Sequence, residues 1–81
     1  MLLSKQRTIE VLRRERLGLA EFASEMCISG GEALRIISGR QSLDYSTAKR
    51  LIKLIGYWDF AYAAESEEVR IHAKRIAAEC A

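Results

Sequence analysis

The chain of 81 residues contains no proline. Because proline interrupts helix interiors, its absence suits a chain that is helical throughout. No apolar run approaches the roughly 20 residues that a membrane-spanning helix needs. The opening segment "MLLSKQR" also lacks the apolar stretch of a secretory signal. We therefore expect a helical, cytoplasmic protein that has no membrane partner.

Side chains that commonly catalyse reactions or bind metals are scarce. The two cysteines, Cys27 and Cys80, lack the CxxC spacing of metal and redox sites, so free thiols are expected. His72 is the single histidine and has no second ligand at metal spacing. The sequence shows neither a Ser-His-Asp arrangement nor a glycine-rich phosphate loop. We therefore expect no enzyme, no metal and no other cofactor.

Charge is nearly balanced, with a net of +2, but it is distributed unevenly. Residues 1–16 hold five cations and two carboxylates, and residues 40–56 hold four cations and one carboxylate, so each segment has a net charge of +3. Residues 17–39 hold one cation and three carboxylates, and residues 57–81 hold three and five, so each has −2. The two basic segments are compatible with phosphate contacts, but they do not by themselves identify a nucleic-acid-binding protein.

Apolar residues recur at helical spacing, and strand-like alternation is absent. The predicted helices cover residues 4–15, 19–26, 29–38, 45–55 and 67–80, and the aromatic segment 57–64 is expected to form a short helix or turn. Gly18 is a candidate N-cap, and Leu2 and Leu3 are candidates to fold back onto the core. We expect an all-α, compact bundle of five or six short helices that forms one domain over residues 1–81.

The predicted third helix has clear start and stop signals. Ser29 and Glu32 form the S-x-x-E pattern of a capping box, and Gly39 suits the left-handed position that ends a helix. Asp44 is an N-cap candidate for the fourth helix, and Gly56 is expected to end that helix.

The second and third predicted helices are joined by about three residues, which is helix-turn-helix organisation. Small and apolar residues and a stop glycine follow Ala23 at fixed spacings. They are Ile28 at +5, Ser29 at +6, Ala33 at +10, Ile36 at +13 and Gly39 at +16, followed by the segment "AKRLIKLIG" at residues 48–56. With Leu17 and Phe22, they resemble the lambda repressor-like DNA-binding domains, the Cro/repressor or xenobiotic-response-element helix-turn-helix family. The resemblance covers residues 17–56, and residues 57–81 would form a C-terminal aromatic segment and helix.

The resemblance implies that the helix over residues 29–38 enters the DNA major groove. The base-facing residues would be Gly30, Gly31, Leu34 and Arg35. The phosphate contacts would come from Arg16, Ser29, Arg40, Lys49 and Arg50.

Several positions depart from the family pattern. Gly30 and Gly31 have no side chain to read a base, and Leu34 offers only apolar contact, for example with a thymine methyl group. Leu19 stands where the family often has a polar residue, commonly glutamine, that touches phosphate. Cys27 replaces the usual turn glycine, at a cost of about 1 kcal/mol if its φ is positive.

Two further groups of apolar residues have alternative interpretations. A stripe on the last predicted helix could pack on its own domain or against a second copy in a homodimer: Val69, Ala73, Ile76, Ala77 and Cys80. Trp58, with Tyr57, Phe60 and Tyr62, could stack on bases or anchor a partner. Because this cluster directly follows the fourth helix, we expect it to fill the bottom of the core.

The leading hypothesis is a small, dimeric, sequence-specific transcriptional regulator of phage-repressor or antitoxin-like type that binds double-stranded DNA. The alternative is a helix-turn-helix scaffold used as a protein-interaction module, such as an adaptor or an inhibitor of a regulator. The smooth, apolar surface expected at Gly30, Gly31 and Leu34 favours this alternative.

Overall fold

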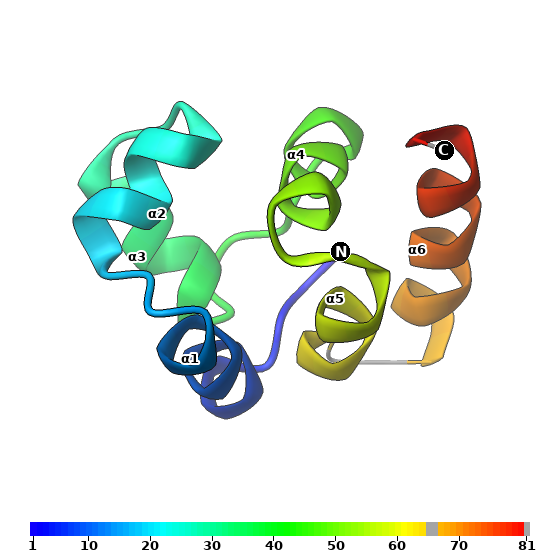
Figure 1. Cartoon of the computed structure of the whole chain (residues 1–81), viewed down its shortest axis with the longest axis horizontal. Helices are drawn as coiled ribbons and strands as arrows, with labels where there is room; N and C mark the ends of the chain where they lie inside the picture. The colour runs from blue at the N-terminus through cyan, green and yellow to red at the C-terminus, as the bar shows by residue number, and fades with distance from the viewer. Residues whose placement is uncertain (65–66, 81) are drawn as a thin grey trace.

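Six helices account for most of the residues that the structure describes. The computed structural model describes the backbone of residues 1–64 and 67–80, and within the last helix the side chains of residues 67–69, 72 and 80 lie outside the description. The helices are α1 (Lys5–Arg14), α2 (Leu19–Met26), α3 (Gly30–Ile37), α4 (Tyr45–Ile55), α5 (Tyr57–Ala63) and α6 (Glu67–Cys80) (Figure 1). The described residues contain no strand, so the expected all-α fold is confirmed.

Side-chain caps begin three of the helices. The Oγ of Ser4 accepts from the Arg7 amide at 3.5 Å, the Oγ of Ser29 from the Glu32 amide at 3.1 Å, and the Oδ1 of Asp44 from the Thr47 amide at 2.7 Å. Each bond satisfies an N–H that has no partner within its helix. The hydrogen bonds from Thr47 also hold the pKa of Asp44 below its ordinary value. Gly18 is the N-cap of α2, as expected.

Left-handed residues end the first three helices. Arg16, Cys27 and Gly39 have φ values of 57°, 58° and 76°. After each of them the next amide bonds back to the carbonyl five residues earlier; the Ile28 amide, for example, donates to the Ala23 carbonyl at 3.0 Å. This is the Schellman pattern, which satisfies the last carbonyls of a helix. The expected positive φ at Cys27 is confirmed, and the thiol of Cys27 is free and exposed.

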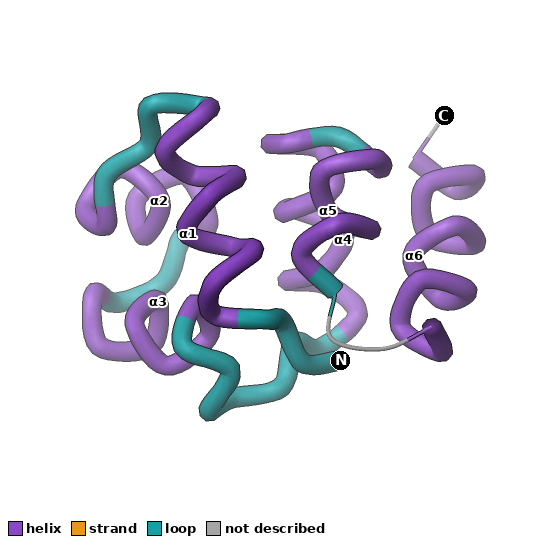
Figure 2. The backbone as a smooth tube through the Cα atoms, turned by 90° about the horizontal axis from the view of Figure 1, so that it is seen from below, coloured by secondary structure: helices purple, strands orange, loops and turns teal. Residues whose placement is uncertain are grey.

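The core receives side chains from every helix. Its buried members include Leu12, Phe22, Ile36, Leu51, Phe60 and Ile76, one from each of α1 to α6. Helix α2 packs on α3, and α5 packs on α1, α4 and α6. The pair α2–α3 therefore lies at one end of the molecule and α6 at the other, with α4 and α5 between them (Figures 1 and 2).

The N-terminal segment joins two distant parts of the fold. The Leu43 amide donates to the Met1 carbonyl at 2.7 Å, and the Ser4 amide donates to the Ala63 carbonyl at 2.7 Å. Leu3 is buried in the core, whereas Leu2 is 42% exposed. Of the two leucines expected to fold back, only Leu3 does so. The segment thereby ties the loop after α3 to the end of α5.

The prediction that Trp58 fills the core is wrong. Trp58 is 82% exposed, and its ring lies edge-on to Tyr57 with centroids 5.1 Å apart. Phe60, which belongs to the same predicted cluster, is fully buried as expected, whereas Tyr62 is 43% exposed. The cause is Gly56, whose φ of 89° and ψ of 161° lie in a region open almost only to glycine. This turn starts α5 with Phe60 inward, and Trp58, two residues earlier, points about 160° away.

Candidate nucleic-acid interface

Helix α3 has one buried side and one open side. Its buried residues are Ala33, Ile36 and Ile37. The four residues that the resemblance makes base-facing are all exposed: Gly30, Gly31, Leu34 and Arg35. At 100° per residue these four positions fall on one side of the helix, centred about 140° from the buried ones. The core thus holds α3 firmly and leaves this side free for contact.

A hydrogen-bonded chain fixes Arg35 on that open side. Its Nε donates to the Oε1 of Gln41 at 2.9 Å, and the Nε2 of Gln41 donates to the Oε1 of Glu32 at 3.0 Å. A Cβ added to Gly31 would lie 3.7 Å from the Nη1 of Arg35. The guanidinium therefore lies back along α3 over Gly31. The Glu32 carboxylate, expected to complete the capping box, instead accepts from Gln41.

Gln41 is a residue of the candidate site that was not predicted from the sequence. It lies in the loop after α3, and its backbone N–H donates to the Arg35 carbonyl at 3.2 Å. The Schellman turn at Gly39 reverses the chain and brings Gln41 beside the helix. The only sequence signal for this contact is the stop glycine, which predicts a reversal but not which side chain then meets Arg35.

The four basic residues among the predicted phosphate contacts fall into two groups. Arg16 and Arg40 are exposed, at the end of α1 and just after α3. Lys49 and Arg50 on α4 have partners within the chain: the Lys49 ammonium lies 6.0 Å from the centre of the Tyr45 ring, and the Nη1 of Arg50 donates to the Met26 carbonyl at 3.1 Å. Arg50 thus places a cation at the C-terminal end of α2, where the helix dipole favours it.

Ser29, the fifth predicted phosphate contact, is the N-cap of α3. Its hydroxyl accepts from the Glu32 amide, so its first role is structural. The hydroxyl proton stays available to donate to an external acceptor.

The predicted dimer stripe on α6 faces its own domain where the structure describes it. Ala73 and Ile76 are buried in the core, and Ala77 is half-buried against it. The side chains of Val69 and Cys80 lie outside the described residues, as does that of His72. The outward side of α6 carries Ile71, which is 60% exposed.

The sequence matches no protein-family model, no curated protein and no solved structure. Within the described part of the chain, no helix is both long and apolar enough to cross a membrane. The same residues hold no cluster of His, Cys, Asp and Glu side chains fit for a metal ion.

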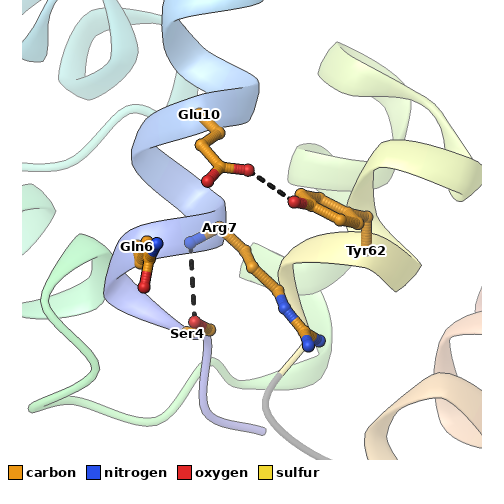
Figure 3. Close-up of a pocket in the computed structure, with 5 residues that line it drawn as sticks. All are labelled: Ser4, Gln6, Arg7, Glu10 and Tyr62. Carbon is orange, nitrogen blue, oxygen red and sulfur yellow. Dashed lines mark hydrogen bonds between the residues drawn. The ribbon is translucent and has the colours of Figure 1, made fainter.

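A second surface feature, a polar hollow, lies between α1 and α5 (Figure 3). The Tyr62 hydroxyl donates to the Glu10 carboxylate, and the Arg7 guanidinium lies 5.5 Å from the centre of the Tyr62 ring. Nearby, Arg14 and Asp59 form an ion pair at 2.7 Å. These contacts bind α1 to α5, so the polar groups of the hollow stabilise the fold and point to no ligand.

The contact between Tyr62 and Glu10 predicts a pH dependence of stability. The hydrogen bond to Glu10 raises the pKa of Tyr62 above its ordinary value of 10.0. The folded chain therefore holds the phenolic proton more tightly than the unfolded chain, so this contribution is fully present below about pH 10 and is lost as pH rises through the folded pKa. In urea denaturation, the stability gap between the wild type and Tyr62→Phe should be constant from about pH 6 to 9, where the Glu10 carboxylate is ionised, and shrink in this alkaline range. Tyr57→Phe is the control, and a gap independent of pH would contradict the assignment.

Proposed function

We propose that the chain is a small, sequence-specific DNA-binding transcriptional regulator in which α2 and α3 act as a helix-turn-helix. The observation that carries the proposal is the open side of α3, where Gly30, Gly31, Leu34 and Arg35 are all exposed. A helix that the core holds on one side and leaves free on the other meets the requirement for reading the major groove.

Each residue on this face would contribute in a different way. A Cβ at Gly30 would meet nothing within 4 Å, so the α3 backbone can approach a base pair closely there. Leu34 would contact a thymine methyl group, and Arg35 would donate to the N7 and O6 of guanine. Because Gln41 already orders Arg35, less side-chain entropy would be lost on binding.

The backbone of the DNA would be held by groups around α3. The N-terminal end of α3 carries the positive end of a helix dipole, which suits a phosphate. Arg40 and Arg16 are exposed cations that would add phosphate contacts, each of which strengthens binding and steepens its salt dependence. A homodimer would place two such faces on successive half-sites of an operator.

The test begins with selection from a random duplex pool, followed by fluorescence anisotropy of the enriched duplex and a scrambled one in a salt series. Arg35→Ala should weaken binding to the enriched duplex about 10- to 100-fold and affect the scrambled duplex less. Arg40→Ala should weaken both duplexes alike and lower the salt slope by about one.

Lys74→Ala is the matched control, because Lys74 is an exposed cation on α6, at the far end of the molecule. Lys74→Ala should change the affinity for the enriched and the scrambled duplex by no more than about twofold. Failure to enrich any duplex at low salt, or unchanged affinity in Arg35→Ala, would refute the proposed reading helix.

The alternative function, a protein-interaction module, is favoured by a separate observation. Leu34 and Leu19 lie on α3 and α2 and are 56% and 42% exposed. The side chain of Leu19, at the start of α2, has no donor for a phosphate oxygen, whereas it can be covered by an apolar side chain of another protein. The duplex selection distinguishes these two functions.

A further inference from the structure

An apolar groove opens between α1, α2 and α3. It encloses a volume of about 250 Å³. Its lining consists of Ile9, Leu12 and Arg13 from α1, Leu17 from the turn before α2, Leu19 from α2, and Leu34 and Ile37 from α3. Seven residues from three helices and a turn thus meet at one hollow. The groove is not predictable from the sequence, because no local pattern links Leu19 to Leu34.

The groove has a rigid floor and an uncovered rim. Leu12 and Ile37 are each 7% exposed and belong to the core, so the floor cannot collapse without disturbing the fold. Leu19 and Leu34 at the rim keep about half of their surface in water. Single exposed leucines are common, but two on the same preformed hollow leave connected apolar surface for another molecule to bury.

The α1 wall of the groove is basic, while the Glu21 carboxylate lies near Gly18, between the lining residues Leu17 and Leu19. Arg13 is the one charged residue among the described residues that line it. On α1, Lys5, Ile9 and Arg13 recur at i, i+4 and i+8, which places them on the same side of the helix. The wall beside the apolar floor is therefore basic, and it complements an occupant that carries carboxylates.

We propose that this groove binds an amphipathic helix of a partner protein. Leucine-type side chains of that helix would lie between Leu19 and Leu34, and a carboxylate at its edge would pair with Arg13. Docking of one apolar helix face into a groove is a recurrent mode of peptide recognition, and the small volume suits one or two anchoring side chains. Leu34 is shared with the face proposed to read DNA, so the partner would displace DNA. That competition rests on the proposed DNA binding, while the docking itself does not.

The probe is a pair of synthetic helical peptides of about 14 residues, or four turns. Both carry leucine at i, i+3 and i+7, and one has glutamates at the edges where the other has lysines. Each is titrated into the full chain labelled with ¹⁵N while amide shifts are followed. The glutamate peptide should bind about five- to tenfold more tightly than the lysine peptide and shift the amides of the groove residues. Arg13→Glu should reverse the order of the two peptides.

Leu34→Gln tests the apolar half of the site. Leu34→Gln should lower the affinity for the glutamate peptide about tenfold, since much of the apolar surface that one leucine would bury on binding is lost. Ile71→Gln is the matched control, because Ile71 is 60% exposed on α6 against 56% for Leu34 on α3. It should leave the affinity unchanged. Both residues are largely in water, so both variants are expected to keep the wild-type amide spectrum.

Other outcomes would overturn the inference. These are equal binding of both peptides, shifts confined to another surface, or equal effects of Leu34→Gln and Ile71→Gln. If duplex DNA, but neither peptide, changed the amide chemical shifts of the groove residues, the groove would be assigned to DNA. Concentration-dependent shifts without peptide would assign it to a second copy of the chain. A chain that binds the glutamate peptide but no duplex would remove the proposed function and leave this inference intact.

Discussion

Phe60→Ala should lower the free energy of unfolding by about 3 to 5 kcal/mol, whereas Trp58→Ala should lower it by less than about 1 kcal/mol. Both residues are large aromatics on α5, two positions apart. Phe60 is fully buried among α1, α4 and α6, the helices on which α5 packs, while Trp58 is 82% exposed. Truncating Phe60 removes buried apolar surface and leaves a cavity, and truncating Trp58 removes surface already in water.

The loss at Phe60 is large for a chain of this length, because domains of about 80 residues unfold with roughly 4 to 12 kcal/mol. Urea denaturation followed by far-ultraviolet circular dichroism measures both variants. Phe60→Leu keeps most of the volume and should cost about 1 to 2 kcal/mol, so it remains folded where Phe60→Ala fails to fold. Equal losses in Phe60→Ala and Trp58→Ala would mean that α5 is rotated relative to the structure described above.

Gly39→Ala is expected to lower the free energy of unfolding by about 2 to 3 kcal/mol. Two independent effects add. The φ of Gly39 is 76°, where a Cβ costs about 1 to 2 kcal/mol, and that Cβ would lie 2.8 Å from the Leu3 carbonyl oxygen. Since this oxygen is backbone of the buried N-terminal segment, it cannot rotate away. Either the end of α3 or the N-terminal segment has to shift.

Two variants separate these effects in the same denaturation experiment. Gly39→Asn tolerates left-handed backbone but keeps the Cβ, so it should still lose about 1 kcal/mol or more. Gly30→Ala is the matched control at the other end of α3, where an added Cβ meets nothing within 4 Å. It should be neutral or stabilise the chain by a few tenths of a kcal/mol. If Gly39→Ala were as mild as Gly30→Ala, the N-terminal segment would not pack where the structure has it.

The helix positions followed from local signals and were predictable. Ser29 and Asp44 cap their helices through the amide three residues on, and Gly39 ends α3, so the bounds depend on residues close together in the sequence. The open side of α3 followed from the same periodicity, which buries Ala33 and Ile36 and leaves the opposite positions in water.

The features that were predicted wrongly or missed from the sequence are contacts between helices, which depend on how the helices are placed in space. Trp58 is hydrophobic and follows an apolar helix, yet the turn at Gly56 decides which aromatic of α5 enters the core. Arg16 adopts a left-handed conformation, which glycine adopts far more readily than arginine, because the chain has to turn there before α2 begins. The groove at Leu19 and Leu34 likewise exists only once α1, α2 and α3 have packed.

The position of Trp58 has a consequence for spectroscopy. It is the only tryptophan of the chain, and water already surrounds most of its indole in the folded state. Its emission should therefore be red-shifted and open to quenching by iodide or acrylamide while all six helices are intact, and unfolding should change it little. A molecule that covers α5 would shift the emission to the blue. Intrinsic fluorescence of this protein thus reports encounters at one surface, while the helical circular dichroism signal reports folding.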